Sequence, residues 1–365
     1  MNGIERKLRE GSVDLLAEIN GFIRRGISFA IFHLPGSPVV NLAIQSEGSV
    51  RLFYDIEELN GKEGFVIAPF KINRQCPLVL IKPDIEVEVE FDRDKHLDMH
   101  SSELQTSPTA NYSANFDVFI NALQEKRFDK LVLSRSQDFD IESGFSPADV
   151  FFRASLTYVH SYVYLCYTPY TGVWLGSTPE VILSGEGDDW NTVALAGTQS
   201  LQNGQLPQEW DDKNRKEQEY VASYVRNQLE TFGIRPIESG PYPAYAGALS
   251  HLKTDFKFSL PDNKRLGTLL DLLHPTPAVC GLPKEAAYRF ILENERHDRC
   301  YYSGFVGMIA PDKKTDLYVN LRCMNIDTGK LTLYAGGGLL ATSDLEDEWQ
   351  ETEKKMLTML RMVKN

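Results

Sequence analysis

The chain has 365 residues, enough for one large domain or two domains of about 150 residues each. Hydrophobic residues make up 42% and charged residues 24%, a globular composition that excludes a disordered chain. The 38 basic and 51 acidic residues give a formal net charge of −13, which argues against a nucleic-acid partner. A small anionic substrate stays compatible with this charge, because local groups decide its binding.

Five cysteines stand singly in the sequence, at positions 76, 166, 280, 300 and 323. No CxxC or HExxH motif occurs, so the spacing predicts neither a zinc site nor an iron–sulfur site. The first 14 residues lack the apolar core of a signal peptide, and the chain has no apolar run of about 18 residues. We therefore expect a cytoplasmic enzyme without a membrane partner.

The first third of the chain is rich in predicted strands. Helical periodicity covers residues 13–25, and turn signals then separate extended runs at residues 27–34, 39–44, 51–54, 64–70, 78–81 and 87–91. This pattern predicts antiparallel pairing. Residues 92–113 are polar, and we place a boundary there, between an N-terminal portion (residues 1–105) and a core (residues 106–365).

Helices and strands mix in the remaining two thirds. Predicted helices cover residues 115–127, 207–232 and 283–294, with two more beginning at Ser146 and at Ser343, where Glu346 completes a capping-box pattern. Predicted strands cover residues 130–141, 162–167, 172–183, 192–196, 302–309, 317–324 and 331–335. Adjacent strands interrupted by isolated helices predict an α+β fold rather than a parallel βαβ sheet.

Carboxylates gather on two of the predicted helices. Glu348, Glu351 and Lys355 share one face of the last helix, and Lys213 and Glu217 share a face of the long polar helix. Carboxylates from two helices can hold a hard cation such as Mg²⁺. The spacing alone more often describes two solvated, salt-bridged helix faces.

For each of the other candidate residues, a purely structural role is also compatible with the sequence. The glycines at positions 336–338 (Gly336, Gly337 and Gly338) would let backbone amides approach an anion, or would form a turn. His274 lies in a proline-rigid segment, and Arg322 interrupts an apolar strand, where it either binds a carboxylate or faces outward. Lys130 and Glu180 can act as base and acid only where burial disfavours their charged forms.

Eight motifs in a fixed order give these residues a common explanation. They are residues 130–135 (KLVLSR), 176–180 (GSTPE), 195–198 (LAGT), 273–278 (LHPTPA), 295–304 (ERHDRCYYSG), 321–322 (LR), 335–338 (AGGG) and 348–351 (EWQE). Together they resemble the chorismate-utilising enzymes, which include isochorismate, salicylate, anthranilate and aminodeoxychorismate synthases. The resemblance covers roughly residues 115–365. It implies two packed antiparallel sheets flanked by helices, an active site in a deep cleft, and residues 1–105 completing one continuous unit.

The resemblance also implies the chemistry. Lys130 would activate water to attack C2 of chorismate, and Glu180 would protonate the departing C4 hydroxyl, giving isochorismate. Water-using members of the family have a lysine at the position of Lys130. Ala196 agrees with this assignment, because aminodeoxychorismate synthases carry a lysine there.

The metal site follows from the same resemblance. Glu217 and Glu351 match the Mg²⁺ ligands, Glu348 matches a partner that acts through water, and Asn214 stands where a nearby acidic residue is common. Gln218 replaces a histidine that the family often has after the first ligand. These departures bear on metal affinity rather than on the reaction.

The substrate contacts are also implied by the resemblance. Arg322 and the amides of residues 336–338 would hold the pyruvyl carboxylate, and Lys355 would add positive charge at the ring carboxylate. Thr198 and His274 would line the ring site. The glycine segment departs slightly from the family pattern, reading AGGG where AGAG is usual.

Several alternatives stay open. Salicylate synthase, which goes on to eliminate pyruvate, shares Lys130 and Glu180, whereas anthranilate synthase and a non-catalytic binder of chorismate-like anions fit less well. Menaquinone biosynthesis is favoured over siderophore biosynthesis only as the commoner route. We expect no glutaminase subunit and favour a monomer.

Overall fold

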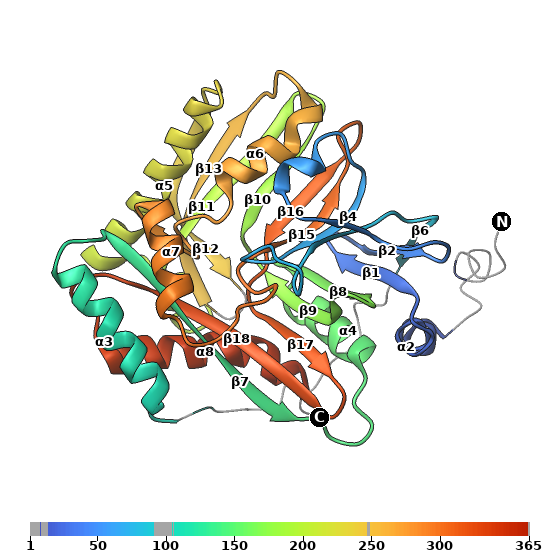
Figure 1. Cartoon of the computed structure of the whole chain (residues 1–365), viewed down its shortest axis with the longest axis horizontal. Helices are drawn as coiled ribbons and strands as arrows, with labels where there is room; N and C mark the ends of the chain where they lie inside the picture. The colour runs from blue at the N-terminus through green and yellow to red at the C-terminus, as the bar shows by residue number, and fades with distance from the viewer. Residues whose placement is uncertain (1–7, 9–13, 91–103, 105, 247–248, 364–365) are drawn as a thin grey trace.

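Two large antiparallel sheets, packed face to face, form the centre of the molecule (Figure 1). The computed structural model describes residues 8, 14–90, 104, 106–246 and 249–363. Every strand pair in both sheets is antiparallel, and helices cover the outer faces. The α+β prediction is therefore confirmed.

Sheet A contains nine strands among the described residues. In spatial order they are β14 (Gly281–Leu282), β7 (Lys130–Asp140), β18 (Lys330–Leu339), β17 (Cys323–Asp327), β9 (Gly172–Thr178), β8 (Tyr162–Thr168), β1 (Ser28–His33), β2 (Val39–Gln45) and β6 (Ile85–Glu90). The longest register without a shift joins β7 to β18, from Leu131↔Leu339 to Asp140↔Lys330. The site described below is built on this pair.

Sheet B likewise has nine strands in the described part of the chain. Their order is β12 (Ile237–Ala246), β13 (Leu249–Phe258), β11 (Asp189–Ser200), β10 (Val181–Glu186), β16 (Thr315–Val319), β15 (Phe305–Ile309), β4 (Gly64–Ala68), β5 (Leu78–Ile81) and β3 (Arg51–Phe53). Strands from the first 90 residues thus lie in both sheets beside strands from the core. The boundary expected after residue 105 falls in a segment that lies mostly outside the described residues.

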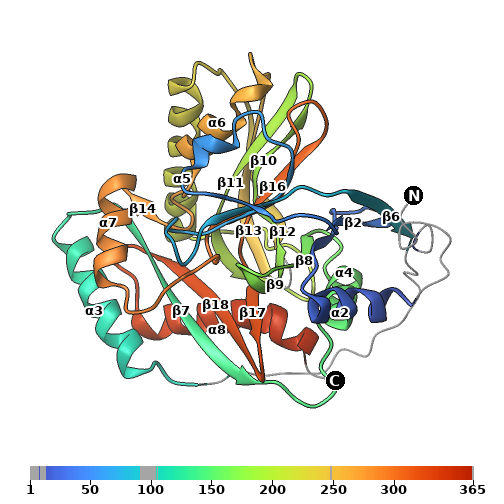
Figure 2. The ribbon, with the colours of Figure 1, turned by 45° about the vertical axis from the view of Figure 1, so that its right-hand side comes forward.

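Seven α-helices are described, and most of them cover the sheets. They are α2 (Leu15–Arg25), α3 (Ala110–Gln124), α4 (Pro147–Thr157), α5 (Asp212–Thr231), α6 (Leu266–Leu273), α7 (Lys284–Asn294) and α8 (Leu345–Val363), with short 3₁₀ turns at Ile56–Leu59 and Asn263–Arg265. Helices α5 and α6 lie on sheet B, helices α2, α4 and α8 lie on sheet A, and α3 and α7 pack near β7 (Figure 2). Among the described helices, none has the length and apolar character needed to cross a membrane.

Apolar side chains fill the space between the sheets and the space under the helices. The inter-sheet core is aromatic, and the rings of Tyr162 and Tyr318 stack across it with centroids 4.3 Å apart. Separate clusters join sheet B to α5 and α6, and sheet A to α2, α4 and α8. The cavity that holds the candidate site opens between these layers.

Two of the predicted strands are in fact pairs of strands that change sheet. The run at 172–183 breaks at Pro179, so β9 lies in sheet A and β10 in sheet B. The run at 317–324 breaks before Cys323, and Arg322 takes a left-handed φ of 47° at that break. Alternating hydrophobicity continues through both breaks, which is why the sequence predicts one strand each time. Strands β12 and β13 and helix α6 were not predicted.

The cap of the last helix also differs from the prediction. Asp344, not Ser343, caps α8, because its carboxylate accepts hydrogen bonds from the backbone N–H groups of Glu346 and Asp347. The Ser343 hydroxyl instead donates to Glu348 at 2.7 Å. The serine therefore belongs to the functional site rather than to the helix end.

Close packing between β4 and the start of β15 gives a first prediction. A Cβ at Gly304 would overlap the carbonyl oxygen of Ala68, which is fixed in a strand. We expect Gly304→Ala to lower the free energy of unfolding by about 3 kcal/mol, as measured by urea denaturation. The matched control is Gly21→Ala, whose Cβ meets only the flexible end of Arg25, and which should be neutral or stabilising by up to about 1 kcal/mol. Equal effects of the two substitutions would contradict this account of the packing.

Candidate active site

A narrow cavity collects most of the candidate residues from both sheets and from two helices. Its lining consists of Val132, Pro179, Glu180, Leu195, Ala196, Gly197, Thr198, Glu217, His251, Ala278, Val279, Tyr302, Leu321, Arg322, Gly336, Gly338 and Lys355. Residues that are far apart in the sequence meet there because β7, β11, β18, α5 and α8 converge on one point. Most of the eight motifs therefore contribute to one site.

Glu180 follows Pro179 at the point where the chain passes from sheet A to sheet B. Only 2% of this residue is exposed, and its carboxylate accepts one hydrogen bond, from the Thr276 hydroxyl at 3.3 Å. Burial raises the pKa of Glu180 to about 7, although the positive charge of nearby Lys130 opposes the shift. A carboxyl group in this state can hold a proton near neutral pH and release it to a substrate.

Lys130 is the first residue of β7 and is completely buried. Its Nζ lies 2.9 Å from Oε1 of Glu217, which projects from helix α5. The two side chains meet beside Gly338 of the neighbouring strand, where a Cβ would clash with both. The missing side chain at Gly338 is thus a condition for this buried ion pair.

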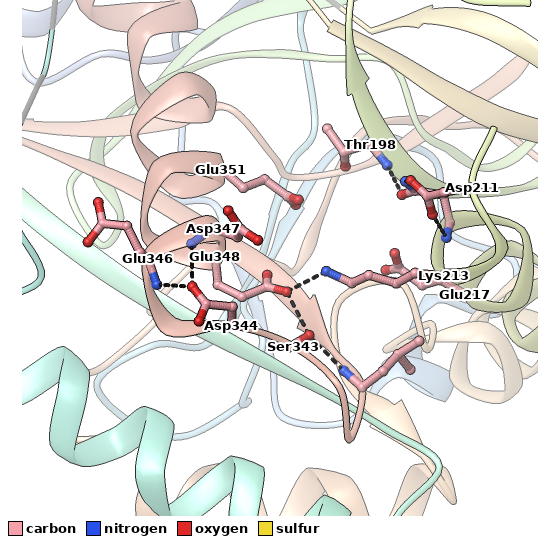
Figure 3. A network of polar contacts seen from close by, with 12 residues as sticks. Thr198, Asp211, Lys213, Glu217, Ser343, Asp344, Glu346, Asp347, Glu348 and Glu351 are labelled. Carbon is pink, nitrogen blue, oxygen red and sulfur yellow. Dashed lines mark hydrogen bonds and ion pairs between the residues drawn. The ribbon is translucent and has the colours of Figure 1, made fainter. Parts of the chain in front are cut away.

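Three carboxylates from α5 and α8 approach the cavity, and each pairs with a lysine. Figure 3 shows the three carboxylates and one of these pairs, Lys213 with Glu348. The pairs are Glu217 with Lys130 at 2.9 Å, Glu348 with Lys213 at 2.6 Å, and Glu351 with Lys355 at 2.6 Å. The carboxylates are therefore not on solvated helix faces. The lysines balance much of the negative charge that would otherwise be buried together.

Glu348 is a carboxylate of this site whose hydrogen bonds are incomplete among the described residues. Only 1% of Glu348 is exposed, and its Oε2 has no hydrogen-bond partner among the described residues. Burial, together with the negative charge of Glu351, raises the pKa of Glu348 to about 7. Burial alone would also raise the pKa of Glu351, but its bond to Lys355 places that pKa below the ordinary value. Carboxylate oxygens with an unpartnered buried atom fit a hard divalent cation such as Mg²⁺.

Arg322 lies on the opposite side of the lining, at the second point where the chain changes sheet. It is 94% buried, and its Nη2 donates to Nε2 of His251 at 3.0 Å. The Nδ1–H of His251 in turn donates to the carbonyl oxygen of Gly197 at 2.6 Å. Burial and the charge of Arg322 lower the pKa of His251 to about 3, so the ring is neutral. His251 was not predicted, because the strand that carries it, β13, was not predicted.

Thr198 and Asn214 connect strand β11 to the start of helix α5. The side-chain oxygen of Asn214 accepts the backbone N–H of Thr198 at 2.8 Å, and its amide nitrogen donates to the capping residue Asp211 at 2.7 Å. The expected place of Asn214 beside the metal ligands stays a prediction. In the structure its side chain fixes the edge of the cavity where Thr198 stands.

The glycine segment was expected at the end of a strand, as a loop that presents amides. In the structure residues 336–338 lie within β18 and pair with β7. Pairing with β17 ends at Met324↔Leu333, so one edge of the glycine segment has no registered strand partner. Added side chains would meet Tyr302 at position 336, Glu348 at position 337 and Glu217 at position 338. The glycines therefore provide space for charged and aromatic neighbours.

His274 was expected to line the ring site, and it is not among the residues that line the cavity. Its ring packs edge-on against Phe305, with centroids 5.3 Å apart, and it is absent from the lining given above. The cis peptide bonds of this part of the chain include His274–Pro275. The same segment supplies Thr276 to Glu180 and places Ala278 and Val279 in the lining.

Comparison with known proteins agrees with the class of site that this geometry defines. Residues 82–364 match the family model described as "Chorismate binding enzyme", and the chain belongs to that family. It is 31% identical over 242 residues to the isochorismate synthase EntC of Escherichia coli (strain K12), covering 64% of this chain and 62% of that relative. The chain thus matches less than two thirds of the length of that relative.

Solved structures support the same fold. A Bacillus anthracis structure described as a putative 2,3-dihydroxybenzoate-specific isochorismate synthase, DhbC, matches 95% of this chain and 99% of its own, with a TM-score of 0.76 and 24% identity. The menaquinone-specific isochorismate synthase MenF of Escherichia coli matches 97% of this chain and 92% of its own, with a TM-score of 0.77 and 19% identity. At these identities the likeness concerns the fold.

The contact at Gly338 gives a second prediction. Gly338→Ala should push Glu217 and Lys130 apart and lower kcat/KM for chorismate by about 100-fold, because small displacements of reacting groups cost about that much. The measurement is a steady-state assay with chorismate, accompanied by a thermal unfolding scan. A variant that keeps wild-type turnover would contradict the role given to this contact, and a folded but inactive variant would support it.

Proposed function

We propose that this protein is an isochorismate synthase that isomerises chorismate to isochorismate with the aid of Mg²⁺. One observation carries the proposal: a completely buried lysine, Lys130, interacts electrostatically with Glu180, a buried carboxyl group of raised pKa. Glu180 lines the cavity, and Lys130 pairs with Glu217 of the same lining. Neither residue type is commonly buried without a functional reason. The family membership supplies the substrate class.

In the proposed reaction Lys130 takes a proton from a water molecule that attacks C2 of the chorismate ring. A lysine can accept this proton only in its neutral form. In the structure Nζ of Lys130 lies 2.9 Å from Oε1 of Glu217. Because Glu217 also lines the cavity, a cation held there would compete with Lys130 for the same carboxylate.

Glu180 would donate its proton to the C4 hydroxyl, which then leaves as water. The double-bond system shifts between C2 and C4, so one water molecule enters and one departs without a covalent intermediate. The raised pKa of Glu180 suits this role, since a proton is available near neutral pH. Thr276 holds the carboxyl group in place through its hydroxyl.

Glu217 and Glu351 would hold the metal ion, with Glu348 beside them. A bound Mg²⁺ would offset the charge of the substrate's ring carboxylate. Glu348 has the buried oxygen without a partner, and Ser343 and Lys213 fix its other oxygen. These contacts orient Glu348 toward the space between the two helices (Figure 3).

Arg322 and Lys355 would provide positive charge for the dianionic substrate. Lys355 Nζ lies 2.7 Å from the carbonyl oxygen of Gly336, which fixes it against strand β18. Arg322 has a buried Nε without a hydrogen-bond partner among the described residues, a donor suited to a carboxylate. The two cations place positive charge at the cavity of a chain whose net charge is −13.

Two further assignments belong to the same proposal. Isochorismate, rather than salicylate, is the proposed final product, because the isochorismate synthases named above are the relatives this chain resembles. The solved structures are described as menaquinone-specific in one case and 2,3-dihydroxybenzoate-specific in the other. We favour menaquinone biosynthesis as the pathway, with siderophore biosynthesis as the alternative.

The acid and base assignments give a third prediction. Lys130→Ala and Glu180→Gln should each lower kcat by about 1,000-fold, the scale of a lost general acid or base. Chromatography of reactions with purified protein, chorismate and Mg²⁺ should show isochorismate with the wild type and almost none with the variants. The reaction should stop when a chelator removes Mg²⁺ and resume when the ion is restored.

Matched controls separate this loss from damage to the fold. Lys313→Ala and Glu346→Gln alter exposed residues and should keep full turnover. Near-normal turnover by Lys130→Ala or Glu180→Gln would refute the roles assigned to these residues. Salicylate with pyruvate as the products, or anthranilate formed from added ammonium, would replace the proposed activity by one of its rivals.

The pKa of Glu180 gives a fourth prediction, for the pH dependence of the reaction. The general acid works in its protonated form, which predominates below a pKa of about 7. At alkaline pH kcat/KM should therefore fall, approaching a tenfold loss for each pH unit. A pH–rate profile that stays flat or rises well above neutrality would show that Glu180 is not the proton donor.

A further inference from the structure

Two cysteines from distant parts of the sequence meet on the side of the molecule where β4 ends and β15 begins. The Sγ atoms of Cys76 and Cys300 and a carboxylate oxygen of Asp298 all lie within 4.8 Å of one another. Among the described residues, no other three His, Cys, Asp or Glu side chains bring ligand atoms this close. Cys76 is buried, Cys300 is half-buried and Asp298 is exposed, so the cluster is reached from solvent on one side.

Hydrogen bonds of the backbone hold these side chains in place. The carboxamide oxygen of Asn73 accepts the N–H of Cys76 at 2.9 Å, which closes a tight turn before β5. The N–H of Cys300 donates to Asp298 at 2.8 Å, and its carbonyl oxygen accepts from Phe70 at 3.0 Å. Cys300 also takes a left-handed φ of 49°, a conformation that costs energy in a residue with a side chain.

We propose that Cys76, Cys300 and Asp298 bind a thiophilic divalent cation of the Zn²⁺ class, with water as the remaining ligand. Two sulfur donors and one oxygen donor suit a borderline-soft, tetrahedral ion. The site is separate from the carboxylate site at the cavity, whose oxygen donors suit a hard ion. Each thiol releases its proton to solvent as its metal–sulfur bond forms, so the step needs no oxidant.

The carboxylate of Asp298 favours a metal over a disulfide between the two cysteines. A disulfide is uncharged, so the negative charge of the carboxylate beside it does not stabilise it. The same negative charge attracts a divalent cation and offsets its charge.

A bound cation would join the turn at residues 71–77 to the segment that carries Tyr302 into the cavity. The two segments already meet where the Tyr301 hydroxyl donates to the carbonyl oxygen of Pro77 at 2.9 Å. Tyr302 lines the cavity, and its ring stacks on Tyr334 with centroids 5.7 Å apart. The metal would therefore stabilise one wall of the candidate active site from outside.

Cobalt is a suitable probe, because Co²⁺ bound to thiolates absorbs strongly in the near ultraviolet whereas Co²⁺ bound to carboxylates does not. The full chain, reduced and freed of metal with a chelator, would be titrated with Co²⁺. We expect a thiolate charge-transfer band that saturates at a single equivalent and disappears when Zn²⁺ displaces the cobalt. Zn²⁺ should also raise the thermal unfolding temperature.

Variants of the three proposed ligands test whether the thiolate charge-transfer band arises from this site. Cys76→Ala and Cys300→Ala should each abolish the band, and Cys166→Ala, which removes a thiol buried elsewhere, should keep it. Asp298→Asn retains the acceptor for the Cys300 N–H but loses the charge, and should weaken Co²⁺ binding by at least about tenfold. This variant tests the carboxylate without removing the turn that holds Cys300.

Three results would overturn the proposal. The first is the absence of a thiolate band in the wild type, and the second is a band that persists in the Cys76→Ala or Cys300→Ala variants. The third is a thiol titration of the unfolded, unreduced chain that finds two fewer free thiols than the five cysteines, with the loss confined to Cys76 and Cys300. That result would show a disulfide in place of the metal.

Discussion

The burial of Lys130 against Glu217 is the interaction on which the rest of the site depends. Removing a charged lysine from water is costly, and its partner must lie close enough to compensate. The partner reaches it only because Gly338 has no side chain at the crossing point. A long antiparallel pair of β7 with β18 holds both backbones in register, so the sheet fixes the position of the charge. The absence of a side chain at Gly338 is therefore a condition both for this packing and for the proposed chemistry.

Two changes of sheet position two further groups of the proposed site, Glu180 and Arg322. The chain leaves sheet A after β9 and enters sheet B at β10, and Glu180 stands in that crossing. It returns from β16 to β17 through a second crossing that carries Arg322. The crossings are adjacent, since the Ser177 N–H donates to the carbonyl oxygen of Arg322 and the Val319 N–H donates to that of Glu180. The proposed proton donor and the proposed anion-binding cation thus stand at adjacent crossings between the sheets.

The sequence indicated which residues would gather at one cavity, and it was less informative about how the strands and helices arrange them there. Hydrophobic alternation predicted most strands and the α+β class, but it did not show the crossing at Pro179, because apolar residues continue on both sides of it. His251 was missed because the strand that carries it was not predicted, and His274 was expected at the cavity because it lies in a motif. Pairing of Cys76 with Cys300 depends on which loops meet, which spacing does not encode.

The net negative charge of the chain does not describe the local charge at the cavity. A net charge of −13 would repel a dianion at long range, but the lysines at positions 130, 213 and 355 are paired with carboxylates at the cavity. In the proposed reaction, a metal ion that took these carboxylates would free the lysines to interact with the substrate. Arg322 hydrogen-bonds a neutral histidine rather than a carboxylate, so it would be available to an anion without such a release. The proposed site would thus provide local positive charge inside an acidic protein once both the metal and the substrate were bound.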